Sequence, residues 1–253
     1  MSAPLVLLPP SKGKAEGGEQ PTYGEVVARD GGALGDARRQ VLAAVLDDVD
    51  ALDDAALARL AGVGTGRVAD ARKLLVGLPA APTMPAHRRY RGVVHGNAGL
   101  AELDPEGAGA DVRVVSALLG LAAMADPVPD YRLEVAARLP SLGGLGGWWR
   151  ERVAEELARL GQGRRVWDLL PAEHARVWDA GVRRDLDVVS VRFVRPDGRA
   201  ANAARTKVCK GRLTATLLAH PDLDAVGLTR RADPGAGWQL EASGADVTAI
   251  CRI

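Results

Sequence analysis

Four side chains able to bind an anion or move a proton lie close together in the middle of the sequence. Asp126 and Glu134 supply carboxylates, Tyr131 a phenol and Arg132 a guanidinium. A guanidinium binds phosphates and carboxylates through a planar fork, and a carboxylate or a phenol can transfer a proton. A structural clasp between Arg132 and one of the two carboxylates fits the same spacing. The residues alone leave both interpretations open.

A buried strand is expected to position these groups. Residues 112–119 are rich in Val and Leu, which favours a mostly buried strand over an amphipathic helix, and this strand carries Ser116. Prolines at positions 127 and 129 then bias the residues before them away from the helical conformation. The polar groups are therefore expected on a loop at the C-terminal end of a central strand, where sheets usually place their sites.

A second loop of this kind follows residues 5–8, an apolar run that predicts the first buried strand. Ser11 and Lys12 come next and offer a hydroxyl and an ammonium to an anion, although the glycine spacing of an ATP-binding P-loop is missing. Because strands of one sheet bring their ends together, both loops and a later helix are expected to line one cleft. The predicted cleft residues are Ser11, Lys12, Ser116, Asp126, Tyr131, Arg132, Glu134, Lys207 and Lys210, with Lys12, Asp126 and Glu134 as candidates for catalysis.

Residues 36–78 are predicted to be helical, and residues 54–75 within them resemble a helix-hairpin-helix. Gly62 and Gly64 let the backbone turn tightly, and the next helix would offer unpaired N–H groups and a positive dipole end to a DNA phosphate. Contacts of this sort fix position on DNA without reading its sequence. An ordinary helical hairpin is the alternative. The candidate DNA-binding residues are Gly62, Gly64, Thr65, Gly66, Arg67, Arg72 and Lys73.

Two more stretches of the N-terminal half have a distinctive composition. Residues 87–91 hold a histidine, a tyrosine and three arginines, which makes them a second candidate for phosphate contact. Residues 16–35 are polar and rich in glycine, which predicts a mobile surface loop.

Composition limits the classes of function. With 253 residues, 47% of them hydrophobic, the chain can bury a substantial core, and a net charge of +1 gives no nucleic-acid footprint over the whole chain, although a local basic surface remains possible. Only 4% of the residues are aromatic, which argues against a platform that stacks single strands. The two cysteines and four scattered histidines lack metal-ligand spacing, so we expect no metal and no cofactor. We predict neither a signal peptide nor a membrane partner, and a reducing cytoplasm fits best.

Several of these motifs resemble the YaaA family of bacterial peroxide-stress proteins. The central signature is Ser116-Ala-Leu-Leu-Gly-Leu, followed by Asp126 and Tyr131-Arg-Leu-Glu134. Further motifs in the family's order are Pro9-Pro10-Ser11-Lys12, Tyr90-Arg-Gly92, Trp148-Trp149-Arg150, Asp168-Leu169 with Glu173, and the stretch from Lys207 to Gly211. The resemblance covers nearly the whole chain, and the sequence departs from it at Val93, His95, Leu119 and Lys210.

Together these features predict one YaaA-like domain over residues 1–253. Its class would be α+β, with a central, mostly buried mixed sheet flanked by helices and a helix-hairpin-helix module near the N-terminal third. The resemblance implies a cytoplasmic protein that binds double-stranded DNA, including structurally distorted DNA, and that protects DNA and limits iron-dependent damage. The alternative is an enzyme that acts on a nucleotide, a nucleobase or damaged DNA through the predicted cleft. Redox sensing by Cys209 is a third hypothesis.

Overall fold

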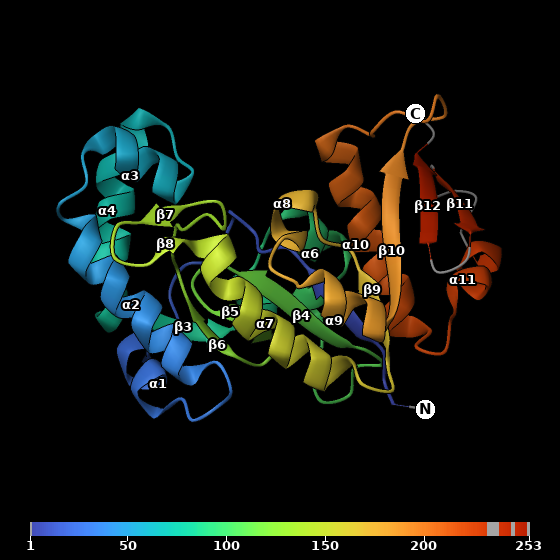
Figure 1. Ribbon diagram of the computed structural model, residues 1–253, viewed down its shortest axis with the longest axis horizontal. Helices are drawn as coiled ribbons and strands as arrows, with labels where there is room; N and C mark the ends of the chain where they lie inside the picture. The colour runs from blue at the N-terminus through green and yellow to red at the C-terminus, as the bar shows by residue number, and fades with distance from the viewer. Residues whose placement is uncertain (1, 232–237, 244–245, 252–253) are drawn as a thin grey trace.

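The computed structural model describes residues 2–231, 238–243 and 246–251, and within them a seven-stranded sheet runs through the molecule (Figure 1). The strand order is β11-β12-β10-β9-β1-β4-β5. Strands β12, β10, β9, β1 and β4 are parallel, and an antiparallel strand lies at each edge. The strands are β1 (Leu5–Leu8), β4 (Asp111–Ser116), β5 (Gly120–Ala123), β9 (Arg165–Asp168), β10 (Asp187–Val194), β11 (Trp238–Ser243) and β12 (Asp246–Cys251).

The predicted central mixed sheet flanked by helices is confirmed, and its parallel middle gives the fold an α/β character that the predicted α+β class did not include. Two neighbouring parallel strands must be joined by a crossover connection. In this chain the crossover connections contain several helices and long irregular stretches, so the sequence does not show a simple alternation of strands and helices.

Strand β1 lies in the middle of the sheet and is buried along its whole length, as its four apolar residues predict. It pairs with β4 on one side and β9 on the other, both in parallel, so the C-terminal ends of all three strands lie at one edge. Ser116 ends β4, and Ser11 follows β1. The strand predicted over residues 112–119 therefore ends three residues earlier than expected, at Ser116. Gly120, at φ 72°, lies against the Trp149 ring and begins β5.

Long helices pack around the sheet. α7 (Leu145–Gly161) crosses in front of it in Figure 1, and α10 (Ala203–Ala219) packs against the short helix α6 (Val93–Asn97). The remaining short helices here are α5 (Ala86–Arg89), α8 (Ala172–Ala175), α9 (Ala180–Asp185) and α11 (Ala225–Arg231). In the described part of the chain, no helix combines the length and the apolarity needed to cross a membrane.

Four helices form a lobe at one end of the molecule, on the left of Figure 1. Helices occupy much of residues 36–78, and the helix-hairpin-helix module expected there stays a prediction. The Asp53 side chain caps the third helix by accepting from the N–H of Ala56, and Asp36 lies in the first turn of the second helix. The helices are α1 (Tyr23–Arg29), α2 (Gly35–Val49), α3 (Asp54–Ala61) and α4 (Val68–Val76).

The mobile loop predicted for residues 16–35 is wrong. The segment contains strand β2 (Gln20–Thr22) and helix α1, whose first turn is closed by a reciprocal capping box between Thr22 and Glu25. Tyr23 is fully buried, and this tertiary packing orders a sequence whose local composition suggests a loop. Two small sheets complete the fold, one of β2, β3 (Pro82–Pro85) and β6 (Pro127–Pro129), the other of β7 (Arg138–Leu139) and β8 (Gly143–Gly144).

Candidate functional site

Lys14 is the inward-facing amine of the loop that follows β1. Its Nζ donates to the carbonyl of Ser11 at 3.0 Å and lies 4.0 Å from the centroid of the Tyr131 ring. Burial lowers the pKa of Lys14 from 10.5 to about 7, with Asp130 opposing the shift and Arg132 adding to it. Near neutral pH a large share of this amine is therefore unprotonated and can act as a base or a nucleophile.

The three tyrosines of the chain are all buried, and they lie near one another. The hydroxyl of Tyr131 shares hydrogen bonds with Ser116 Oγ at 2.8 Å and with the hydroxyl of Tyr90 at 3.0 Å. Burial raises the pKa of Tyr131 to about 12 and also raises the pKa of Tyr90 and Tyr23. The chain of hydroxyls beside Lys14 therefore stays protonated at neutral pH and can relay protons.

Several buried polar atoms in this region have no hydrogen-bond partner among the described residues. They include both ring nitrogens of His95, one carboxylate oxygen of Asp130 and the hydroxyl of Tyr23. His95 is 2% exposed, its ring centroid lies 5.2 Å from that of Tyr90, and burial lowers its pKa to about 3, so the ring is neutral. Native proteins rarely leave buried polar atoms unpaired unless they serve a ligand, a water or catalysis. We refer to Lys14, Tyr90, His95, Asp130 and Tyr131 as the Lys14 site.

Lys12 and Glu134 connect this region to the helical lobe. Lys12 Nζ lies 2.7 Å from Glu134 Oε1 and donates to the carbonyl of Gly62 at 3.2 Å, while the N–H of Glu134 donates to Leu60 at 3.0 Å. Gly62 ends α3 at φ 62°, and a Cβ there would lie 1.9 Å from the Glu134 carboxylate. Glycine is required at this position by the backbone conformation and by the close approach of Glu134.

The turn after Gly62 faces solvent. Gly64, Thr65, Gly66 and Arg67 are all exposed, and a Cβ on either glycine would meet no heavy atom within 4 Å. Gly64 precedes a short 3-10 helix, Thr65–Arg67, that continues into α4. The N–H of Arg67 donates to the carbonyl of Gly64 at 3.0 Å, whereas the N–H groups of Thr65 and Gly66 at the start of the turn have no intrahelical acceptor. Lys73 on α4 is also exposed.

Arg72, predicted to contact DNA, is engaged inside the protein. Its guanidinium donates to the carbonyl of Leu52 at 2.8 Å and to that of Val49, and it lies 3.5 Å from Asp54. These contacts hold the connection between α2 and α3. Arg72 therefore supports the hairpin and is not free to bind a phosphate.

The basic stretch at residues 87–91 is only partly a surface. Arg89 is fully buried and donates to the carbonyls of Val128 at 2.9 Å, Gly17 at 2.8 Å, Pro82 at 3.0 Å and Ala15. His87 is also buried, with Nδ1 2.9 Å from the carbonyl of Met124. The short helix α5 turns these two side chains inward and leaves Arg88 exposed, and Arg91, two residues after the helix, is exposed as well.

Asp126 does not pair with Arg132, so the clasp that the sequence allows between Arg132 and this carboxylate does not form. The Asp126 carboxylate accepts from the N–H of Ala123 at 3.0 Å and lies 3.5 Å from Arg38 of α2. Arg38 also donates to the carbonyls of Leu119 and Leu121, so the two side chains close the β5 turn together. The partner comes from a helix far away in the sequence, which spacing within the loop cannot reveal.

The lysines of α10 are placed differently from each other. Lys207 is exposed, whereas Lys210 is buried and donates to the carbonyl of Leu169 at the end of β9. Burial lowers the pKa of Lys210 to about 8, and Asp168 opposes the shift. Cys209 is 3% exposed, which disfavours rapid reaction with a peroxide.

Some of the residues predicted to line one cleft lie around Lys14, a lysine that sequence reasoning passed over. Ser11, Ser116 and Tyr131 lie near Lys14, and Arg132 and Glu134 act on its charge. Lys12 joins this group through Glu134, whereas Asp126, Lys207 and Lys210 have other surroundings. The sequence offers one signal for Lys14, its position two residues after Lys12 in the same loop.

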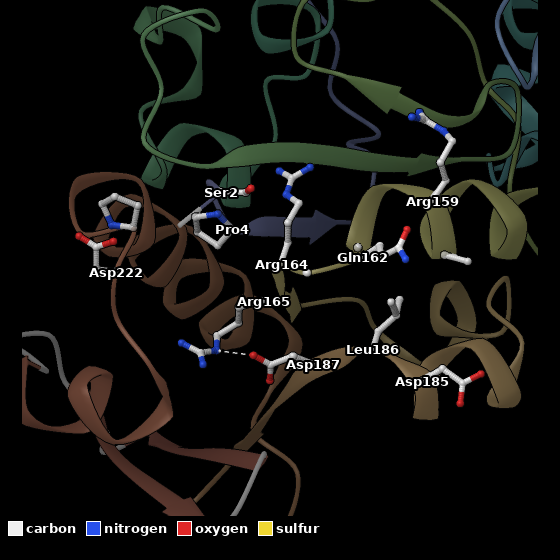
Figure 2. Close-up of a pocket in the computed structure, with 14 residues that line it drawn as sticks. Ser2, Pro4, Arg159, Gln162, Arg164, Arg165, Asp185, Leu186, Asp187 and Asp222 are labelled. Carbon is white, nitrogen blue, oxygen red and sulfur yellow. Dashed lines mark ion pairs between the residues drawn. The ribbon is translucent and has the colours of Figure 1, made fainter.

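A cavity of about 760 Å³ lies elsewhere, near the N-terminal ends of β1 and β9 (Figure 2). Its arginines are occupied, because Arg164 binds Asp111 at 3.2 Å and Arg165 binds Asp187 at 3.2 Å. Arg159 is paired with Glu156 at 2.7 Å. With its cations neutralised in this way, the cavity does not offer an anion site.

The chain is similar to known proteins over most of its length. The model of a family described as peroxide stress protein YaaA matches residues 5–233. A UPF0246 protein of Streptomyces coelicolor is 33% identical over 222 residues, which are 85% of this chain and 83% of that protein. A UPF0246 protein of Corynebacterium glutamicum is 31% identical over 219 residues, 84% of each chain. The matched residues of the family include the exposed hairpin turn and the whole Lys14 site.

Proposed function

We propose, because this chain belongs to the YaaA family of peroxide stress proteins, that it acts in the peroxide stress response by binding double-stranded DNA. In this proposal the protein is cytoplasmic, its partner includes structurally distorted duplex, and its binding protects DNA and limits iron-dependent damage. The observation that supports DNA binding is the exposed turn from Gly64 to Arg67, which has open space around both of its glycines.

A phosphate fits the chemistry of this turn. The N–H groups before a helix carry partial positive charge, and glycines without side chains let an oxygen come close to them. Arg67 and Lys73 are exposed and add charge to the same element. Such contacts are independent of base sequence and weaken with salt as counterions are released. The DNA-binding set in this proposal is Gly64, Thr65, Gly66, Arg67 and Lys73, with Gly62 and Arg72 as supports.

Replacing Gly64 by aspartate is expected to weaken duplex binding by about 10-fold or more, because a carboxylate would repel the phosphate and cover the N–H groups. The fold should persist, since Gly64 has φ −73° and open space around its Cβ position. Fluorescence anisotropy with a labelled duplex, at low and at physiological salt, measures the change.

Gly31→Asp is the matched control. Gly31 is an exposed glycine before the start of α2, also with open space around it, so the same charge is added away from the turn. Its affinity should stay close to that of the unmodified chain. If Gly64→Asp binds as tightly as Gly31→Asp, and salt has no effect, the hairpin only packs and the DNA proposal fails.

A second candidate function is an enzyme that acts on a nucleotide, a nucleobase or damaged DNA. The unpartnered buried atoms beside the Lys14 amine favour it. In this version Lys14 takes the reactive role that the sequence assigns to Lys12 or Asp126, because Lys12 is paired with Glu134 and Asp126 holds a turn.

A further inference from the structure

Lys14 is an amine held in place without a carboxylate partner. Among the described residues, no Asp or Glu oxygen lies within ion-pair distance of its Nζ, whereas Lys12, two residues earlier, is bound to Glu134. The backbone on both sides of Lys14 is fixed, since the N–H of Ala15 donates to Arg89 and the carbonyl of Gly13 accepts from Arg91. The amine is therefore positioned by the fold and left free of a counter-ion.

Several buried polar atoms around this amine have no hydrogen-bond partner among the described residues. The neutral ring of His95, 2% exposed, has two unpartnered nitrogens, and Asp130 keeps one buried oxygen unpaired. The Tyr131 hydroxyl lies in the middle of a hydrogen-bonded chain, between the hydroxyls of Tyr90 and Ser116. A small ligand with several hydroxyls would pair with these atoms, as a sugar does, and would meet an amine at the same place.

We propose that Lys14 forms an imine with the aldehyde of a ring-opened deoxyribose, the group exposed at an abasic site of DNA. The choice of an abasic site rests on the proposed DNA binding. Glu134 lies against Gly62 at the start of the hairpin turn and acts on the charge of Lys14, so this carboxylate links the amine to the segment proposed to hold the duplex. Abasic sites are also structurally distorted, as is the DNA named in that proposal.

The step needs no cofactor and balances in atoms and electrons. The lone pair of the unprotonated Nζ attacks C1′ of the aldehyde, and the carbonyl oxygen leaves as water after it is protonated. The product is a C1′–Nζ double bond, and addition of water reverses the step. Nothing is oxidised or reduced. A lysine with a pKa near 7 supplies the unprotonated amine at neutral pH, and the hydroxyl chain from Tyr131 can carry protons to the leaving oxygen.

Borohydride reduction of the full chain, incubated with a duplex that holds one abasic site, tests the inference because it converts an imine into a stable amine. We expect a covalent protein–DNA adduct, and peptide mapping should place it on Lys14. Lys14→Arg keeps a cation but offers a guanidinium, so the adduct should fall by roughly 50-fold or more. Mapping on the unmodified chain does not depend on how well the variant folds, and an adduct on another lysine or on the N-terminal amine overturns the inference.

A second arm replaces the duplex by free 2-deoxyribose 5-phosphate, again with borohydride. Labelling of Lys14 in both arms supports the inference with the abasic site as the source. If only the free sugar phosphate labels Lys14, the imine at Lys14 stands, but its source is a small-molecule aldehyde and the abasic site is overturned. If Lys14 is labelled in neither arm, the inference is overturned.

Anisotropy with the same duplex separates this result from the proposed function. A duplex that binds but gives no adduct on Lys14, with no labelling by the free sugar, rejects the inference and leaves DNA binding standing. If the duplex does not bind, the proposed DNA binding is rejected. The experiment with the free sugar phosphate then decides by itself whether Lys14 forms an imine.

Discussion

Replacing Arg89 by methionine is expected to lower the free energy of unfolding by about 4 kcal/mol, because one buried and three partly buried carbonyls lose their donor. Arg89 is fully buried, and its guanidinium binds carbonyls of β6, of the first residue of β3 and of the loop that carries Lys14. Each unpaired carbonyl costs roughly 1–3 kcal/mol. Removing a buried charge offsets part of the loss, since burial already lowers the pKa of Arg89.

Urea denaturation of the two proteins measures this difference. Arg88→Met is the control, because Arg88 is the exposed neighbour on the same helix and should change stability by less than about 0.5 kcal/mol. An Arg89→Met chain as stable as Arg88→Met would mean that the guanidinium does not hold these segments together.

Lys14→Met is expected to change stability in the opposite direction, by a gain of roughly 1–3 kcal/mol at pH 6. In the folded chain the pKa of Lys14 is about 7, below the 10.5 of an exposed lysine. Below pH 7 both states are protonated, so the folded state bears the whole cost of burying the charge. Between pH 7 and 10.5 the folded amine is neutral, and the cost falls as pH rises. Methionine removes that cost but loses the bond to Ser11 and the contact with Tyr131, which makes the net gain smaller than the pKa shift alone implies.

Thermal unfolding at pH 6 and pH 9 gives the test. The gain in Lys14→Met should be largest at pH 6 and should shrink at pH 9, whereas Lys73→Met, which removes an exposed lysine, should show no such trend. Equal destabilisation of Lys14→Met at both pH values would make Lys14 a structural residue. A residue whose replacement stabilises the folded protein is typically one that serves the function rather than the fold.

Local signals were sufficient for the elements that local forces determine. The apolar run of β1, the cap of α3 by Asp53 and the helical segment around Gly62 all follow from residue types within a few positions. Ser116 and Tyr131, two of the residues expected to line one cleft, share a hydrogen bond of 2.8 Å between their hydroxyls.

Non-local contacts decided the rest. Arg88 and Arg89 look alike in the sequence, but α5 points Arg89 at four carbonyls and leaves Arg88 exposed. Lys12 and Lys14 are distinguished only by the distant residues Glu134 and Tyr131, which bind one amine and cover the other. Charge patterns give no information about such partners until the strands and helices that carry them are placed.

The contact between Gly62 and Glu134 makes two regions of the protein depend on each other. Glu134 contacts the hairpin at Gly62 and acts on the charge of Lys14. Under the proposed DNA binding, a duplex that shifts Gly62 would change the field at the amine, and a molecule bound at the amine would change the position available to the turn. Energetic coupling of this kind is reciprocal. Whatever factor a sugar bound at Lys14 applies to the dissociation constant of DNA, DNA must apply the same factor to the dissociation constant of the sugar.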